Sequence, residues 1–517
     1  MLKRLNWQLL LEGAWAVTLL CLPVTSFPWI SDRWGFLVAP LSALPLILLL
    51  VVWLIPYLWR RGALPKESQP LFWFVIFTIV ISALAFFTVS IPGFREKSMA
   101  GQELRAFVTL AIGLSFYLVT AALPQDEPRL RRTLLWINIG GALLVAWTML
   151  QAYYIYIHPP NFPKWVWDFQ DLLVASSPFT FLKGSNRISG LAYEPSWFAH
   201  QLNLLYFPLW LSAVFNWHSA FPFRIFKLPL ELFLLIVGMG EFMLSSPRVG
   251  MLALLMMLGF LFIKAILILY RKLMDRFSNM RAPQQSGGRH RQVLLKATVA
   301  GISLALILVI FSLMAGGAVR FASQRDPRIA LLLENPPRLQ EIAGVLSLDE
   351  DDLVWMGMRF AFLERVVYWL AGWRTFGEFP LFGVGLGNTG FFFAQNFPSI
   401  GYATYEIRDV IYRFPGLPNV KSLWVRLLSE TGVAGFSIFL AWLFVLWQSA
   451  RLTHHSPKRL FKSLALAGQL ALIALVVEGF SIDSFALPYL WVSAGLISAS
   501  GCLYRKEVKA GLYDGPR

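Results

Sequence analysis

Long apolar runs recur along most of the chain. A helix that crosses about 30 Å of hydrocarbon needs about 20 mostly apolar residues, and by this criterion the sequence predicts about 12 transmembrane helices. They begin near Leu9, Phe36, Leu71, Leu104, Thr133, Leu191, Leu228, Val249, Ala297, Leu423, Ser463 and Ser484. We therefore expect an all-α, polytopic membrane protein.

Two segments outside these runs are longer than a connection needs. Residues 158–189 are rich in Pro and aromatic residues, which favour the membrane interface. The second segment is 320–419, where residues 352–377 have helical periodicity with Trp355, Phe362, Val366 and Trp369 on one stripe. We expect amphipathic helices that lie on the outer face as a lid, with a re-entrant hairpin as the alternative.

These patterns divide the chain into three parts. Residues 1–319 hold the first nine predicted spans, residues 320–419 form the large outer loop, and residues 420–517 hold the last three spans and a tail. The composition agrees with a membrane protein, because only 14% of the residues are charged, against about 25% in soluble domains.

The formal charge of +16 would suggest a nucleic-acid partner in a soluble protein, but its distribution indicates otherwise. With the N-terminus inside, the inner loops and termini carry a net charge of +19 and the loop 320–419 carries −2. Because basic residues concentrate in cytoplasmic loops, both termini are expected in the cytoplasm. The excess charge therefore sets orientation, and we expect no nucleic-acid partner.

Several motifs do not support a metal or a cofactor. The run from Gly385 to Gly390 spells G-x-G-x-x-G without a strand–helix unit around it, so it predicts a tight turn. The acidic run from Asp349 to Asp352 is typical of a solvated helix cap. The six histidines are scattered, which argues against catalytic zinc, and His200 is interpreted as a packed or cavity-lining histidine. We expect neither a metal nor a cofactor.

Charged residues also occur at the outer ends of several predicted spans, where they are costly and usually mark a functional cavity. The alternative is local pairing, as an i,i+4 pair such as Arg426 with Glu430 would give. The residues concerned are Arg187 and Glu194 at the sixth span, Arg248 between the seventh and eighth, and Lys421 and Arg426 at the tenth.

Cations gathered at an outer leaflet suit an anionic lipid headgroup. The planar guanidinium fork binds phosphate oxygens, so several arginines can hold a pyrophosphate and stabilise it as a leaving group. Glu194, near the membrane boundary, could accept a proton from an attacking hydroxyl. The residues alone thus predict a site for a lipid-linked phosphate, without specifying the reaction.

Ordered motifs over residues 185–500 resemble the O-antigen ligase and Wzy-type polysaccharide polymerase superfamily. They are RISGLAYEPSWFA, LSSPRVGMLALL, RVVYWLAGWRTFGEFPLFGVGLGN and LWVRLLSETGVAGF. The resemblance implies a GT-C-like fold in the bacterial inner membrane. It also implies transfer of a glycan from undecaprenyl pyrophosphate to a sugar hydroxyl on the periplasmic face, without a metal.

By this resemblance, Arg248 and Arg365 bind the pyrophosphate in catalysis, and Glu194 is the candidate base. Arg187 is a further candidate beside Glu194. Arg374, ten residues before Gly385, matches a polymerase pattern, with loop structuring as the alternative. Lys421 and Arg426 complete the expected substrate-binding set.

Ligases of this superfamily carry His-Asn about nine residues before their Glu-Thr-Gly, where this chain has Lys421-Ser422. The departure favours a polymerase of O-antigen or exopolysaccharide repeat units. A ligase that joins glycan to lipid A core or protein remains an alternative, and a solute transporter is another. The resemblance also implies a flippase and a chain-length co-polymerase as possible partners.

Overall fold

The computed structural model describes residues 2–175, 187–224, 226–278, 339–346, 349–359, 362–414 and 416–513, with single positions between 298 and 338. The described residues form helices and turns without any strand, apart from one isolated β-bridge between Ser26 and Ala39. The predicted ninth span, near Ala297, lies outside the continuously described residues.

The helices of the first half run from α1 to the long α12. They are α1 (Leu2–Leu20), α2 (Pro28–Trp34), α3 (Ala43–Leu49), the π-helix η1 (Leu50–Leu54), α4 (Ile55–Trp59), α5 (Ser68–Thr88), α6 (Met99–Ala122), α7 (Glu127–Ile157), α8 (Lys164–Leu173), α9 (Pro195–Gln201), the π-helix η2 (Leu202–Tyr206), α10 (Phe207–Asn216), α11 (Leu230–Ser245) and α12 (Arg248–Ser278).

The second half begins with short helices and ends with three long ones. They are α15 (Leu339–Leu346), α16 (Glu350–Arg359), α17 (Leu363–Glu378), η3 (Thr389–Phe392), α18 (Phe393–Asn396), η4 (Ser399–Ala403), α19 (Tyr405–Tyr412), α20 (Leu423–Thr453), α21 (Arg459–Glu478) and α22 (Pro488–Lys509).

Six helices of the described residues are long and apolar enough to cross a membrane: α5, α6, α7, α12, α20 and α21. Each coincides with a predicted span, so the chain is a helical membrane protein. The predicted starts near Leu9, Phe36, Leu191, Leu228 and Ser484 fall in or beside α1, α3, α9, α11 and α22. These helices are shorter, broken by a π-helix or charged at one end, and the count of about 12 spans stays a prediction.

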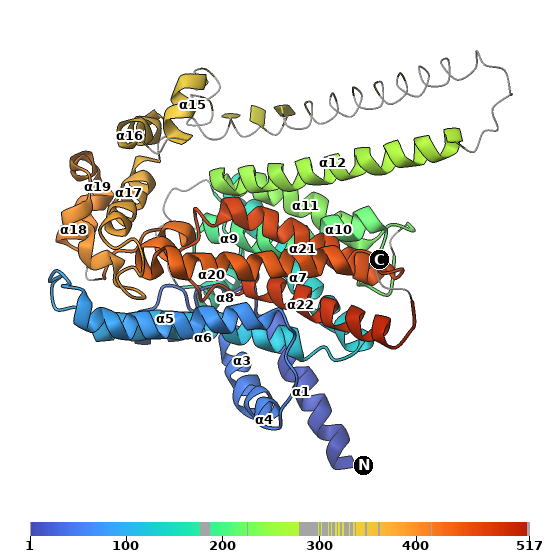
Figure 1. Cartoon of the computed structure of the whole chain (residues 1–517). Helices are drawn as coiled ribbons and strands as arrows, with labels where there is room; N and C mark the ends of the chain where they lie inside the picture. Colours follow the sequence, from blue (N-terminus) through green and yellow to red (C-terminus); the bar gives the residue numbers. More distant parts are fainter. Residues whose placement is uncertain are drawn as a thin grey trace.

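The centre of the bundle is α21, which is buried over 83% of its apolar window. It packs against α20 and α22, its neighbours in sequence, and against α10 and α12 (Figure 1). On the other side, α20 packs on α5 and α22 packs on α6. The outer faces of these helices keep apolar side chains exposed, such as Ile79 and Phe87 of α5, as a hydrocarbon solvent allows.

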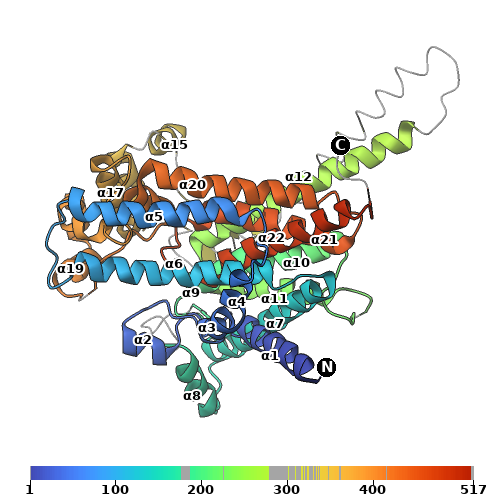
Figure 2. The same ribbon diagram turned by 60° about the horizontal axis from the view of Figure 1, so that its bottom comes forward.

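The two ends of the bundle differ. Helices α17, α18 and α19 gather at one end, and both chain termini lie toward the opposite end (Figures 1 and 2). We call the first the loop end. The predicted outer loop thus contributes short helices here, and none described within 339–412 is long enough to span.

A glycine-rich turn inserts into a kink of α20 at the loop end. Gly383, Gly385 and Gly387 all have φ between +68° and +87°, a region that side chains avoid. The Gly385 N–H donates to the Glu430 backbone carbonyl over 3.0 Å, because α20 is interrupted at Gly432 (φ 63°, ψ −175°). The predicted tight turn is confirmed, and it is anchored within the bundle.

We predict that Gly432→Ala lowers the melting temperature of the detergent-solubilised protein. A Cβ here would lie 2.2 Å from the Leu381 carbonyl oxygen, and this backbone conformation is essentially restricted to Gly, at a cost of about 1–3 kcal/mol for other residues. Gly240→Ala is the matched control, because nothing lies within 4 Å of its Cβ position. Equal melting temperatures for the two variants would contradict the kink's role.

Candidate functional site

Helix α21 ends at the loop end with Glu478, whose side chain is buried at 0% exposure. Its Oε2 lies 2.6 Å from His200 Nδ1, and its Oε1 accepts a hydrogen bond from Asn203 Nδ2 over 2.5 Å. Asn203 also donates to the Gly250 carbonyl over 2.9 Å. One carboxylate therefore ties α9 and η2 to α21, and Asn203 extends the network to α12.

The segment that supplies these partners contains the π-helix η2, a wide turn often found at functional sites. Several of its buried polar atoms have no hydrogen-bond partner within the described structure: His200 Nε2, both amide atoms of Gln201, Asn203 Oδ1 and the Tyr206 hydroxyl. The interpretation of His200 as a packed or cavity-lining histidine agrees with its burial and its contact with Glu478. Its partner Glu478 was not singled out from the sequence, although a carboxylate inside an apolar run is itself a signal.

Residues 479–487, which connect α21 to α22, contact three other parts of the loop end. The Gly479 carbonyl accepts from the Leu423 N–H over 2.7 Å at the start of α20. The Asp483 carbonyl accepts from Arg426 Nη1 over 2.6 Å. The Phe480 ring lies 5.7 Å from the ring of Trp369 on α17. This connection therefore joins the predicted cations of α20 to α17.

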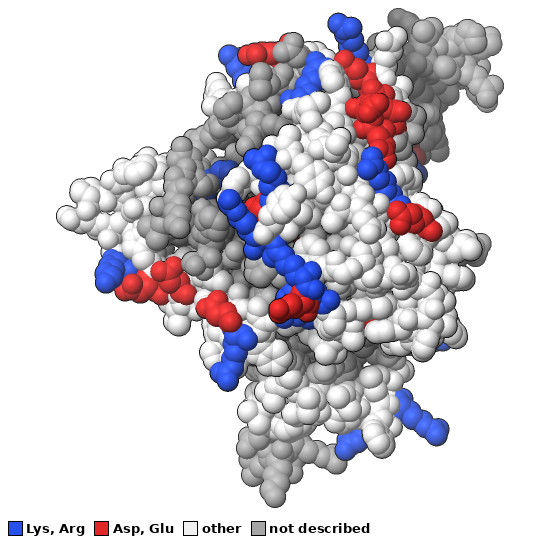
Figure 3. All heavy atoms as spheres, turned by 90° about the vertical axis from the view of Figure 1, so that its left-hand side faces the viewer, with Lys and Arg blue, Asp and Glu red and all other residues white. Residues whose placement is uncertain are grey.

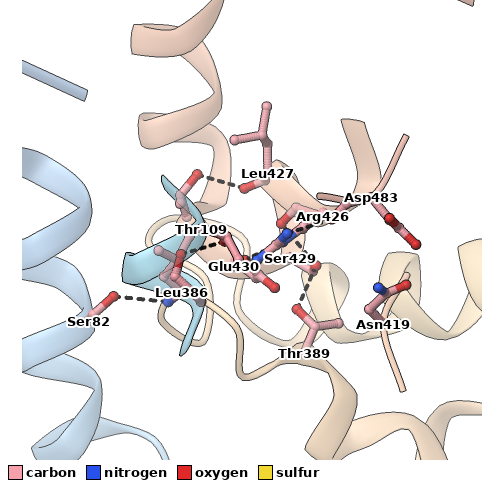
Figure 4. Close-up of polar contacts among 12 residues, drawn as sticks. Ser82, Thr109, Leu386, Thr389, Asn419, Arg426, Leu427, Ser429, Glu430 and Asp483 are labelled. Carbon is pink, nitrogen blue, oxygen red and sulfur yellow. Dashed lines mark hydrogen bonds and ion pairs between the residues drawn. The ribbon is translucent and has the colours of Figure 1, made fainter. Parts of the chain in front are cut away.

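Arg426 is enclosed by protein groups on several sides (Figure 4). Its Nε donates to Glu430 Oε2 over 2.9 Å, and its guanidinium lies over the Phe485 ring at 4.7 Å. The side chains of Arg426 and Glu430 are only 9% and 5% exposed. The alternative of a local i,i+4 pair therefore describes Arg426 better than substrate binding does, and its bond to the Asp483 carbonyl positions the connection 479–487.

Arg187 lies against the turn that carries Arg248. Its Nε donates to the Ser245 carbonyl over 2.8 Å and its Nη2 to the Ser246 carbonyl over 3.2 Å. These carbonyls end α11, and Arg248 opens α12 two residues later. The structure thus brings together two candidates that are 61 positions apart in the sequence.

Glu194 stands at the N-cap position of α9, half-buried. One carboxylate oxygen accepts a hydrogen bond from the Ser196 hydroxyl over 2.9 Å. The same short helix carries His200 toward Glu478, so Glu194 and the buried network are positioned by one element.

On α17, Arg365 and Trp369 are one turn apart and share a face. Arg365 Nη1 and Trp369 Nε1 are buried, and neither has a hydrogen-bond acceptor within the described residues. Buried donors without acceptors cost about 1–3 kcal/mol each. A ligand that brings acceptor oxygens to this face would remove that cost. Arg365 was expected from the resemblance, whereas the Trp369 indole N–H was missed.

Arg374 is paired with a carboxylate of the protein. It pairs with Glu350 of α16 through two hydrogen bonds, the shorter at 2.5 Å, and also donates to the Asn396 carbonyl over 3.2 Å. The hydrogen bonds from Arg374 lower the pKa of Glu350 below its usual value. The loop-structuring alternative therefore describes Arg374 better than substrate binding does.

Lys421 is also paired. Its ammonium group contacts the Glu406 carboxylate of α19 and lies over the Tyr368 ring at 4.4 Å from its centroid. These contacts hold α19 and α17 to the start of α20. Lys421 thus organises the loop helices around the site.

Figure 3 views the loop end face on and shows Lys and Arg side chains grouped near its middle. Arg426, Arg374 and Lys421 have carboxylate partners. The Arg365–Trp369 face differs, because Arg365 Nη1 and Trp369 Nε1 are buried without acceptors among the described residues, and it suits an anionic ligand.

Within the described ranges, no group of three His, Cys, Asp or Glu side chains could hold a metal ion. The acidic run instead caps α16, since Asp349 Oδ1 accepts from the N–H groups of Asp351 and Asp352, both over 3.1 Å. This geometry agrees with the predicted helix cap.

Comparison with known proteins assigns no family. No model of a known protein family matches the chain, and no curated protein sequence matches it significantly. The class that the fold defines is a helical membrane protein with a polar network and a cationic cluster at one end.

We predict that Glu478→Ala destabilises the protein more than Glu478→Gln does. The alanine leaves the buried donors of His200 and Asn203 without their acceptor, at about 1–3 kcal/mol for each, whereas the Gln carbonyl can still accept one bond. Thermal unfolding in detergent measures the difference, with Leu452→Ala at an exposed position of α20 as the control. Equal losses for Ala and Gln would contradict the network.

We predict that acid weakens the Glu350–Arg374 pair. Because the pKa of Glu350 is lowered in the folded state, the pair stabilises fully above the unfolded pKa near 4.5 and loses its effect as pH falls through the lower folded value. The gap in melting temperature between wild type and Glu350→Gln should therefore shrink on acidification from pH 7. A gap that stays constant to pH 3 would show that the carboxylate's charge contributes nothing.

Proposed function

We propose that this protein polymerises lipid-linked glycan repeat units. In this proposal it transfers the glycan from undecaprenyl pyrophosphate to a sugar hydroxyl of a second lipid-linked unit, on the periplasmic face of a bacterial inner membrane. The observation that carries the proposal is the face of α17 where Arg365 Nη1 and Trp369 Nε1 are buried without acceptors among the described residues.

The donors on this face suit a pyrophosphate. A guanidinium binds phosphate oxygens through strong, charge-assisted hydrogen bonds, and the indole N–H can donate one more. Arg248, which opens α12 beside the Arg187 contact, supplies a second cation for the same anion. Stabilising charge that develops on a leaving group is the largest single contribution in many enzymes.

The reaction that these groups would support is a substitution at the anomeric carbon. The acceptor hydroxyl oxygen forms the new bond to that carbon while the bond to the pyrophosphate oxygen breaks, and the electron pair leaves with the pyrophosphate. The hydroxyl proton passes to Glu194, whose carboxylate is half-buried beside Ser196. Such general bases typically contribute 10²–10⁴-fold.

The orientation follows from the charge of the loops. The basic inner loops favour cytoplasmic termini, and the termini lie opposite α17–α19 in the bundle (Figure 2). The loop end then faces the periplasm, where lipid-linked glycans are joined. A ligase would use a His at position 421, but this chain has a Lys there that is paired with Glu406, so the polymerase is the better-supported member of the superfamily.

We predict that Arg365→Ala lowers kcat/KM for transfer between lipid-linked repeat units by about 100- to 1,000-fold, as expected for one electrostatic contact to a transition state. Arg365→Lys should recover part of the activity, because an ammonium group keeps the charge without the fork. Trp369→Phe, which removes only one N–H donor, should cost about tenfold or less. Reconstituted vesicles with labelled donor measure these rates.

Arg408→Ala is the matched control, since Arg408 is exposed on α19 and its side chain donates, among the described residues, to the carbonyls of Tyr402 and Ala403 in η4. Wild-type rates for Arg365→Ala would refute the proposal. In cells, deletion of the protein should leave single repeat units on their anchor. Long chains retained on the carrier lipid would indicate a ligase instead, and normal glycans would exclude both.

A further inference from the structure

A lateral groove of about 640 Å³ runs along α20 and α21, within the usual size of ligand sites. On α20 it is lined by Leu428, Phe436, Leu440, Phe444 and Trp447, and on α21 by residues that include Leu472 and Val476. The lining side chains are apolar or aromatic. The groove opens sideways, because Phe444 and Val476 are 61% and 54% exposed.

The length of the groove exceeds what one leaflet requires. Lining residues extend along α20 from Trp424 to Trp447, and 23 residues at the helical rise cover about 34 Å. The hydrocarbon core of a bilayer is about 30 Å thick, so an acyl chain of one leaflet reaches only about 15 Å. A chain that fills this groove is therefore longer than an ordinary acyl chain.

The two ends of the groove differ in chemistry. At the loop end its lining includes Phe480, whose ring faces Trp369, one turn after Arg365. At the opposite end Trp447 packs edge-on against Phe260 of α12 at 6.2 Å. The groove thus begins next to Trp369, whose indole N–H has no acceptor among the described residues, and ends at an aromatic pair.

We propose that this groove holds one long isoprenoid chain of the lipid substrate and that the Trp447–Phe260 pair sets the length it accommodates. The inference rests on the proposed function, which supplies an anionic headgroup at Arg365. The lining reaches α17 at Trp373 and Phe480 contacts Trp369, and this proximity to α17 together with the length of the groove favours a single long chain over two acyl chains. Because the chain exchanges lipid neighbours for the groove, its binding depends on van der Waals packing against the lining side chains, and this packing increases with length until the chain reaches Trp447.

The test uses isoprenoid phosphates without glycan, in a series from chains that end before Leu440 to chains that pass Trp447. Competition with a fluorescent isoprenoid phosphate in nanodiscs measures binding by the full-length protein. For the wild type, affinity should rise with chain length and then level off. Leu440→Trp should weaken binding of long chains about tenfold, because the larger side chain fills the groove, and leave short chains unaffected.

Trp447→Ala should shift the plateau to longer chains, in the direction opposite to Leu440→Trp, which a general loss of stability would not do. Leu84→Trp on the exposed face of α5 lies outside the groove and is the matched control. Identical length profiles for Leu440→Trp and Leu84→Trp would overturn the groove assignment and indicate bulk lipid only, even if glycan transfer continues. Length-dependent binding by a protein that transfers no glycan would instead overturn the polymerase and keep the groove.

Discussion

The carboxylate of Glu478 is the contact on which the loop end depends. Burying a carboxylate is expensive unless its oxygens are hydrogen-bonded, and both oxygens of Glu478 are bonded, to His200 and Asn203. These partners fix the π-helix η2 against α21 and, through Gly250, against α12. The position of Glu478 then determines where residues 479–487 begin, and that connection holds Arg426 and contacts Trp369.

The cations at the loop end divide by what they already bind. Three of them are each paired with a carboxylate: Arg426, Arg374 and Lys421. Pairing lowers the free energy cost of burying the charge, and it also makes the cation less available to a ligand. Arg365 differs, because part of its guanidinium is buried without an acceptor among the described residues. A buried donor without an acceptor destabilises the folded protein, and a bound anion is the simplest group that would provide the missing acceptor.

The helices were more predictable from the sequence than the tertiary contacts between them. The starts of α12 and α20 fall within one residue of the predicted positions, because long apolar runs define them. The Arg426–Glu430 pair was accessible because i,i+4 spacing is local. The Glu478–His200 contact joins residues 278 positions apart, and no periodicity encodes such a pairing. The glycine motif from Gly385 to Gly390 predicted a tight turn, but the insertion of this turn at the α20 kink depends on tertiary packing.

The different requirements of polar and apolar groups explain why an anion site at the loop end and an apolar groove would lie side by side. Within the apolar bundle a buried polar group is costly without a partner, and a ligand that reached α17 would provide acceptors for the Arg365 and Trp369 donors, which have none among the described residues. An anionic headgroup can reach α17 from the membrane only if its hydrocarbon remains in an apolar environment. The groove of α20 and α21 provides that environment up to Phe480, directly beside Trp369. The headgroup can therefore be bound by the polar donors of α17 while the hydrocarbon chain stays in the apolar groove.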